Sequence, residues 1–199
     1  NKLTVLRICL VPVFIVVMML PASVLDPIIS GLIGVAIFIV ASFTDMLDGK
    51  IARRDNLITD FGKFLDPLAD KILVASALIC MVELGWAASW AVALIVAREF
   101  VVSGLRLVAV GSKEKVVIAA GIWGKLKTAV TMAAIVIIFI MRLLCQFNLI
   151  GDANGVSSAS VQLPVSIIGN ILIYISAALT VISGVQYVWH YRGVLKNAK

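Results

Sequence analysis

The sequence predicts an all-α integral membrane protein with six membrane-spanning helices. Of its 199 residues, 62% are hydrophobic and 14% are charged, whereas about 25% are charged in an ordinary soluble domain. The mean hydropathy is +1.11, and a soluble fold of this length could not bury so much apolar surface. Composition therefore excludes a water-soluble enzyme, and the presence of a single histidine, His190, excludes a His-rich zinc site.

Six apolar runs approach the roughly 20 residues that cross a bilayer. The expected spans are 3–20, 28–44, 67–84, 87–110, 116–144 and 163–191. The first ends at Pro21, because proline breaks a helix, and the second ends before Asp45, where an acidic stretch begins. The third starts at Pro67, which suits a first helical turn, and the last three are long apolar runs. No repeat or linker divides the chain, so residues 1–199 are expected to form one transmembrane domain.

The first span has an alternative interpretation as a signal peptide. It contains Lys2 and Arg7 and then an apolar run, but no A-x-A cleavage site follows. Removing this helix would also spoil the charge asymmetry of the chain. The sequence begins with Asn1 rather than methionine, and we expect a few natural residues to precede it.

Lysine and arginine are distributed unevenly between the two sets of connections. None of the 17 Lys and Arg lies in the connections 21–27, 85–86 and 145–162. The positive-inside rule therefore places both termini and the connection 45–71 in the cytoplasm, with the protein in the inner (cytoplasmic) membrane. The net charge of +6 indicates cytoplasmic loops beside membrane lipids rather than nucleic-acid binding.

Four aspartates in this cytoplasmic connection follow helical spacing. Asp45 and Asp48 are three residues apart, and Asp66 and Asp70 are four apart, so each pair shares one face of a helix. A helix–turn–helix would bring the pairs together. Four facing carboxylates stay ionised only if cations neutralise them, and all-oxygen ligation suits Mg²⁺ or Mn²⁺. The spacing therefore predicts a site for two divalent ions, whereas a merely solvated loop would leave it unexplained.

Small residues accompany the first pair of aspartates. Gly49 and Ala52 fall on the same helical face as Asp45, so a flat or bulky ligand could approach the backbone there. Arg53 could then meet a phosphate.

These residues form a pattern that is similar to the signature of the CDP-alcohol phosphatidyltransferases, D-x2-D-G-x2-A-R-x8-G-x3-D-x3-D. The matching positions are Asp45, Asp48, Gly49, Ala52, Arg53, Gly62, Asp66 and Asp70. The resemblance implies six transmembrane helices, a homodimer, and two divalent cations near the cytoplasmic face. It also implies attack of an alcohol on the β-phosphorus of a CDP-linked donor, with release of CMP.

The resemblance further implies roles for individual residues. It makes Asp45, Asp48 and Asp66 metal ligands, and it makes Asp70 a ligand or the general base, which must reach the acceptor hydroxyl. The residues expected to bind the CMP part of the donor are Asn1, Thr4, Asp48, Gly49, Ala52 and Arg53. For Asn1 and Thr4, a cap at the start of the first helix is the alternative interpretation.

Other segments narrow the resemblance to the bacterial branch of the family that uses CDP-diacylglycerol and glycerol 3-phosphate. They lie within 1–7, 63–71, 98–106 and 124–128, and the last third of the chain matches only as another apolar span. A lipid donor suits an embedded enzyme, because its acyl chains can stay in the bilayer.

Several charges lie within or at the ends of the fourth and fifth apolar runs. Burying one in hydrocarbon costs about 2.5–3.5 kcal/mol on insertion scales, so we expect them to face a cavity or a partner. The candidates for binding the acceptor phosphate are Arg98, Arg106, Lys125 and Lys127. Glu99 is expected to pair with a buried arginine. The expected helix-packing positions are Ser103 with Gly104, and Gly121 with Gly124.

Two alternatives stay open. The same chemistry could serve another acceptor, such as inositol phosphate or serine, although the basic residues favour a phosphorylated one. A divalent-cation transporter would instead place carboxylates near the bilayer midplane on discontinuous helices. The aspartates here lie at an interface beside lysines and arginines, which argues against conduction.

Overall fold

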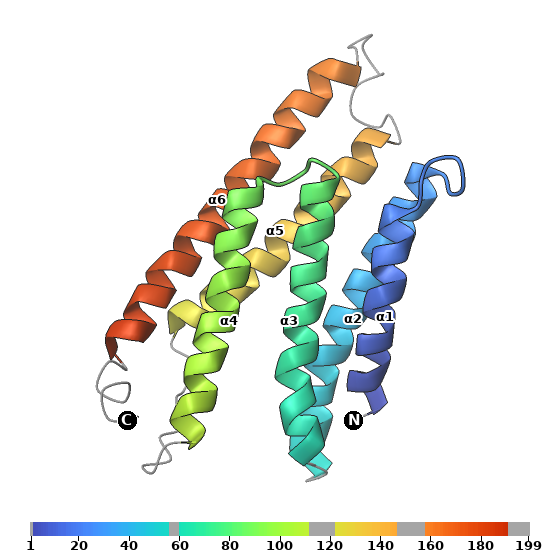
Figure 1. The fold of residues 1–199 in the computed structure, drawn as a ribbon. Coiled ribbons are helices and arrows are strands. Elements are labelled where there is room, and N and C mark those ends of the chain that lie inside the picture. The colour runs from blue at the N-terminus through green and yellow to red at the C-terminus, as the bar shows by residue number, and fades with distance from the viewer. Residues whose placement is uncertain (1, 56–59, 112–121, 147–157, 191–199) are drawn as a thin grey trace.

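The computed structural model describes residues 2–55, 60–111, 122–146 and 158–190, and it shows six helices in this part of the chain (Figure 1). They are α1 (Lys2–Met19), α2 (Pro27–Asp55), α3 (Asp60–Glu83), α4 (Ser89–Gly111), α5 (Ile122–Gln146) and α6 (Ser158–His190). The described residues contain no strand. The prediction of an all-α fold is confirmed.

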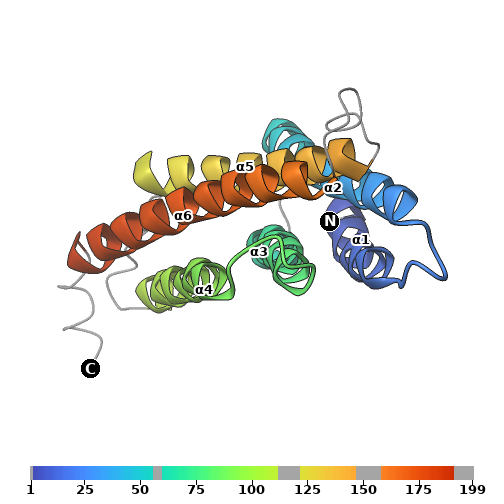
Figure 2. The ribbon, with the colours of Figure 1, turned by 90° about the horizontal axis from the view of Figure 1, so that it is seen from above.

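The helices form two layers of three. Seen from above in Figure 2, α1, α3 and α4 lie in one layer, and α2, α5 and α6 lie in the other. Within the layers α1 packs on α3, α3 on α4, α2 on α5, and α5 on α6, while α1–α2 and α4–α6 contacts join the layers. Because α3 contacts α1, α2, α4 and α5, it is the central element of the bundle.

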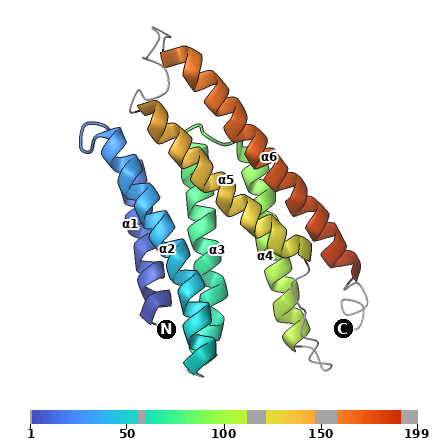
Figure 3. The same cartoon turned by 180° about the vertical axis from the view of Figure 1, so that it is seen from behind.

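The helices run alternately up and down. The start of α1, the end of α2, the start of α3 and the end of α6 all lie at one end of the bundle (Figures 1 and 3). We call this the motif end, because α2 and α3 carry the acidic motif there. The connections 20–26 and 84–88 lie at the opposite, far end (Figure 1). This alternation puts the first and last described residues and the motif-bearing ends of α2 and α3 at one end of the bundle, the end that the charge distribution predicts to be cytoplasmic.

Within the described residues, three helices are long and apolar enough to cross a membrane. They include Pro27–Thr44, Ile122–Gln146 and Val165–Trp189, and Leu6–Met19 is a shorter apolar helix. Their large apolar side chains face outward, as at Val16, Val40 and Ile167, which is the arrangement that a lipid environment requires. The protein is a multi-pass membrane protein, and spanning by α3 and α4, which carry more charge, stays a prediction.

Two boundaries beside the acidic motif differ from those expected. α2 continues beyond Thr44 to Asp55, and α3 already starts at Asp60, so much of the expected connection 45–71 is helical. Hydropathy marks only where a helix leaves the apolar layer, whereas backbone hydrogen bonds and helix-forming residues carry it further. For the same reason Pro67 lies inside α3 rather than in its first turn.

An aromatic cluster joins α1, α2 and α5 in the core. Phe14, Phe38 and Phe139 lie with ring centroids 6.1–6.4 Å apart, and all three are buried. Trp86, in the connection after α3, packs edge-on against Phe139 at 5.7 Å. Phe139 therefore touches all three of the other rings.

We expect Phe139→Ala to lower the free energy of unfolding by about 3–5 kcal/mol, because it removes the shared ring and leaves a cavity. The neighbouring Ile140 is exposed, so Ile140→Ala is the matched control and should have little effect. Thermal unfolding of both variants in a mild detergent checks this, and equal losses would contradict it.

Candidate active site

The motif aspartates lie on adjoining helix ends. Asp45 and Asp48 are on α2, Asp66 and Asp70 are on α3. The two helices contact each other, and both of these segments lie at the motif end (Figures 1 and 3). Since both segments are helical, each pair shares one helical face. The side chains of these four residues lie outside the described part of the structure, so their metal ligation stays a prediction.

The residues expected to bind CMP lie on the same two-helix end or close to it. Gly49, Ala52 and Arg53 are on α2, and Thr4 is on α1, which contacts both α2 and α3. Thr4 lies inside α1 rather than before its first residue, so it is not the N-cap of this helix. Asn1 lies outside the described residues. The ligand contacts of all five stay predictions.

α1 contributes a further cation at this end, which the sequence analysis did not select. The Arg7 side chain is 1% exposed and is held by polar or electrostatic contacts. A buried guanidinium needs such contacts, because desolvating an isolated charge is costly. An arginine within an apolar run was the signal in the sequence that could have identified it.

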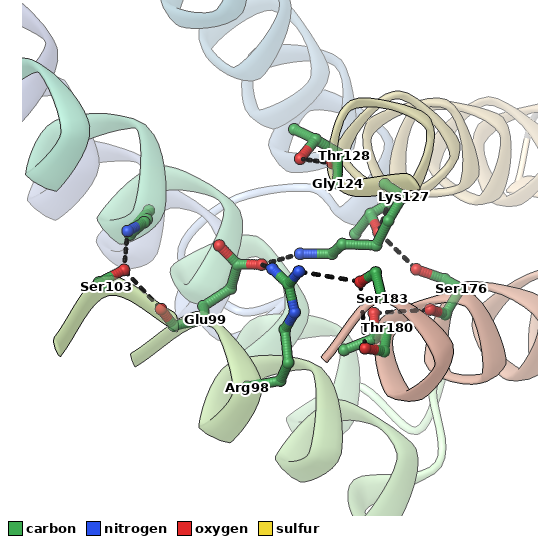
Figure 4. Close-up of polar contacts among 11 residues, drawn as sticks. Arg98, Glu99, Ser103, Gly124, Lys127, Thr128, Ser176, Thr180 and Ser183 are labelled. Carbon is green, nitrogen blue, oxygen red and sulfur yellow. Dashed lines mark hydrogen bonds and ion pairs between the residues drawn. The ribbon is translucent and has the colours of Figure 1, made fainter. Parts of the chain in front are cut away.

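Glu99 of α4 is the centre of a polar cluster inside the bundle. Its Oε1 accepts a hydrogen bond from Arg98 Nη1 at 3.3 Å and forms an ion pair with Lys127 Nζ of α5 (Figure 4). The Lys127 side chain is 4% exposed and that of Glu99 is 23% exposed. Glu99 therefore places a negative charge beside two cations inside an apolar bundle. Its expected pairing with an arginine is confirmed.

Two further helices join this cluster. Arg98 Nη2 donates to Ser183 Oγ of α6 at 2.9 Å (Figure 4). Lys71 of α3 donates to Ser103 Oγ of α4. Thr131 of α5 also hydrogen-bonds Ser176 of α6. Polar contacts thus connect α3, α4, α5 and α6.

A cavity of about 30 Å³ lies against this cluster. Its polar lining includes Lys71, Glu99, Lys127, Thr128 and Thr131, and the rest of its wall is apolar. This volume is enough for ordered water. Lys71 directly follows Asp70, so the cavity reaches the turn of α3 that ends the acidic motif.

The structure brings together only part of the predicted basic pocket. Arg98 and Lys127 meet at Glu99, whereas the side chains of Arg106 and Lys125 lie outside the described part of the structure. Lys71 lines the cavity although we did not select it as a phosphate ligand. In the sequence, the position of Lys71 directly after Asp70 could have indicated this role.

The expectation that Gly104 and Gly124 are packing positions was wrong for the described part of the structure. An added Cβ at either glycine would meet no described atom within 4 Å. The close approaches are instead at α2, where a Cβ on Gly31 would lie 2.7 Å from Leu143 Cδ2 of α5. Sequence spacing alone cannot tell which face of a helix meets a neighbour.

Comparison with known proteins agrees with this arrangement. Residues 1–185 match the model of the CDP-alcohol phosphatidyltransferase family. The chain belongs to this family. The family is generally dependent on divalent cations.

The relatives found are named CDP-diacylglycerol–glycerol-3-phosphate 3-phosphatidyltransferase. That of Bacillus subtilis (strain 168) is 48% identical over 142 residues, which cover 68% of this chain and 72% of the relative. That of Rickettsia bellii is 35% identical over 187 residues, covering 94% and 91%. That of Haemophilus influenzae is 36% identical over 198 residues, covering 97% and 92%. The similarity thus extends along nearly the whole chain, including α6.

We expect Glu99→Gln to destabilise the protein by more than about 2 kcal/mol, because removing one partner of a buried ion pair costs about 3–5 kcal/mol and this carboxylate is partly exposed. Ser176→Ala is the comparison, since an interhelical hydrogen bond in a membrane contributes only about 0.6 kcal/mol on average. Unfolding midpoints in detergent measure both. A loss for Glu99→Gln no larger than that for Ser176→Ala would show that Glu99 does not hold the cluster.

Proposed function

We propose that this protein transfers the phosphatidyl group of CDP-diacylglycerol to a hydroxyl of glycerol 3-phosphate, giving phosphatidylglycerophosphate and CMP. The observation that carries the proposal is the complete acidic motif on the adjoining ends of α2 and α3, beside a cavity lined by Lys71 and Lys127. The names of the relatives from Bacillus subtilis and Rickettsia bellii support the same donor and acceptor.

In this proposal Asp45, Asp48, Asp66 and Asp70 hold two divalent cations, Mg²⁺ or Mn²⁺. A set of carboxylate oxygens suits hard ions, and the helical spacing on two adjoining helices supports a shared site. When bound, the ions polarise the diphosphate and offset the charge that develops on the departing CMP.

Asp70 is the proposed general base. It takes the proton from the acceptor hydroxyl, whose oxygen then forms a bond to the β-phosphorus of the donor. The bond between the β-phosphorus and the bridging oxygen breaks, and CMP leaves with that oxygen. The place of Asp70 directly before Lys71 supports this role, because an acceptor held at the cavity would lie close to it.

The donor's CMP part is proposed to lie against α2 and α1. Gly49 and Ala52 leave space at the α2 backbone, and Arg53, Asp48, Thr4 and Asn1 supply polar groups. The position of α1 against both motif helices supports the contribution of Thr4.

The acceptor phosphate is proposed to bind Arg98, Lys127 and Lys71, together with Arg106 and Lys125. Glu99 already contacts Arg98 and Lys127, and its single carboxylate offsets only one of their two positive charges before the acceptor arrives. A phosphate, with its higher charge, would then compete with Glu99 for the same donors.

The cytoplasmic orientation, the inner-membrane location and the homodimer remain parts of the proposal. The first and last described residues and the motif-bearing ends of α2 and α3 all lie at the motif end (Figure 1), which supports an active site facing the cytoplasm. The helices α2 and α3 run continuously through the four aspartates, which supports phosphatidyl transfer rather than cation transport, since transport sites favour broken helices.

The proposal predicts CMP release from CDP-diacylglycerol and Mg²⁺ only when glycerol 3-phosphate is added. Asp70→Asn should lower kcat by about 10²–10⁴, the usual contribution of a general base. The assay compares glycerol 3-phosphate, inositol phosphate, serine and no acceptor with purified protein. Release with another acceptor would overturn the acceptor assignment, and no release with any acceptor would overturn the activity.

We expect Lys127→Met to raise the KM for glycerol 3-phosphate by about tenfold or more, because a charge-assisted contact to phosphate is lost. The KM for CDP-diacylglycerol should stay unchanged. Arg142→Met removes a cation from the far end of the same helix, where Arg142 lies over the Trp86 ring, and it should leave both constants unchanged. Equal increases in both KM values would place Lys127 outside the acceptor site.

A further inference from the structure

Arg98 is held by two residues of α6, the helix for which the sequence analysis found no motif. Arg98 Nη2 donates to Ser183 Oγ at 2.9 Å (Figure 4). The next residue, Gly184, faces the stem of the same side chain, because an added Cβ there would lie 3.2 Å from Arg98 Cγ and 3.8 Å from Nε. We call Ser183 and Gly184 the α6 seat.

The Ser183 hydroxyl is itself fixed. It donates to Thr180 O at 3.2 Å, and the side chain is buried. Its hydrogen is therefore directed at the backbone, which leaves an oxygen lone pair for the guanidinium. The geometry of the seat is thus set by α6 and does not depend on a freely rotating hydroxyl.

The absence of a side chain at Gly184 is the second part of the seat. A contact of 3.2 Å is shorter than an ordinary van der Waals contact between carbon atoms, which lies at about 3.5–4.0 Å. A methyl group would therefore push the Arg98 stem away from α6. On the opposite side, Glu99 Oε1 lies 3.3 Å from Nη1, so the guanidinium is held from both sides.

We propose that Ser183 and Gly184 are positioning residues that fix Arg98 for the acceptor phosphate and so determine acceptor affinity. This inference rests on the proposed function, in which Arg98 binds that phosphate. A guanidinium carries five N–H donors in a rigid fork, so bonds to Ser183 and Glu99 are compatible with a phosphate contact. Holding the long side chain in place beforehand reduces the conformational entropy lost on binding.

The test is steady-state CMP release by the purified full chain at varied glycerol 3-phosphate and at varied CDP-diacylglycerol. Ser183→Ala should raise the KM for glycerol 3-phosphate by about tenfold, as expected for a lost bond to a charged group. Gly184→Ala should raise it about threefold, since it displaces Arg98 by only a few tenths of an ångström. In both variants kcat and the KM for CDP-diacylglycerol should change less than about twofold.

Two controls separate positioning from stability. Gly169 lies on the same helix, and an added Cβ there would make an ordinary 3.5 Å contact with Ile138 Cγ1. Gly169→Ala should therefore leave the KM for glycerol 3-phosphate unchanged. Ser183→Thr keeps the hydroxyl, so its KM for glycerol 3-phosphate should stay close to that of the unchanged protein. If Ser183→Ala does not fold, Gly184→Ala still tests the seat. A fall in unfolding temperature with no change in acceptor KM would overturn the proposal.

Arg98→Ala distinguishes failure of the seat from failure of the proposed function. If Arg98→Ala raises the acceptor KM while Ser183→Ala and Gly184→Ala do not, Ser183 and Gly184 do not position Arg98, and the phosphate role of Arg98 stands. If Arg98→Ala leaves the acceptor KM unchanged, the phosphate role fails and the seat inference falls with it. In the double variant Arg98→Ala/Ser183→Ala, the serine change should add no further increase, and additive increases would overturn the inference.

Discussion

The ion pairs of Glu99 with Arg98 and Lys127 are the constraint on which the polar half of this bundle depends. A charge facing lipid costs several kilocalories per mole, so cations in apolar helices must turn inward and find a carboxylate. Glu99 provides it, and its ion pair with Lys127 links α4 to α5. The hydroxyls of Ser183, Ser176 and Thr131 then connect α6 to the same cluster. Polar contacts around one carboxylate and two cations thus link three helices, α4, α5 and α6.

The aspartates of the acidic motif, in contrast to the cations around Glu99, must lie outside the apolar layer. Four carboxylates need water or metal ions, and they lie on helix segments that continue α2 and α3 beyond their apolar parts. The backbone can extend there because helical hydrogen bonds do not depend on the surrounding solvent. Along α3 the polar end of the helix, with Asp66 and Asp70, therefore comes before the apolar part. Lys71, at the start of that part, faces the cavity within the bundle.

The sequence predicts the all-α fold and the helical placement of the four aspartates, because hydropathy and residue spacing are local properties. It also predicts that Glu99 pairs with an arginine, since an unpaired charge is costly in hydrocarbon, but it does not predict the buried Lys127 as the second partner. It does not predict Lys71 at the cavity or Ser183 against Arg98, because both depend on helix rotation and on contacts between distant segments. Gly104 and Gly31 show the same limit: each is a small residue in a helix, but only Gly31 meets a neighbouring helix among the described residues.

The arrangement divides the proposed chemistry between two groups of helices. The donor residues lie on α1, α2 and the start of α3, whereas the cations proposed for the acceptor lie on α3, α4 and α5 and are held in part by α6. α3 contacts both groups, and its consecutive residues Asp70 and Lys71 belong to one group each. A change in α4–α6 could therefore alter the acceptor while the donor site stays intact. This follows from the topology, since the only helix shared by the two groups carries both the proposed base and a cation at the cavity.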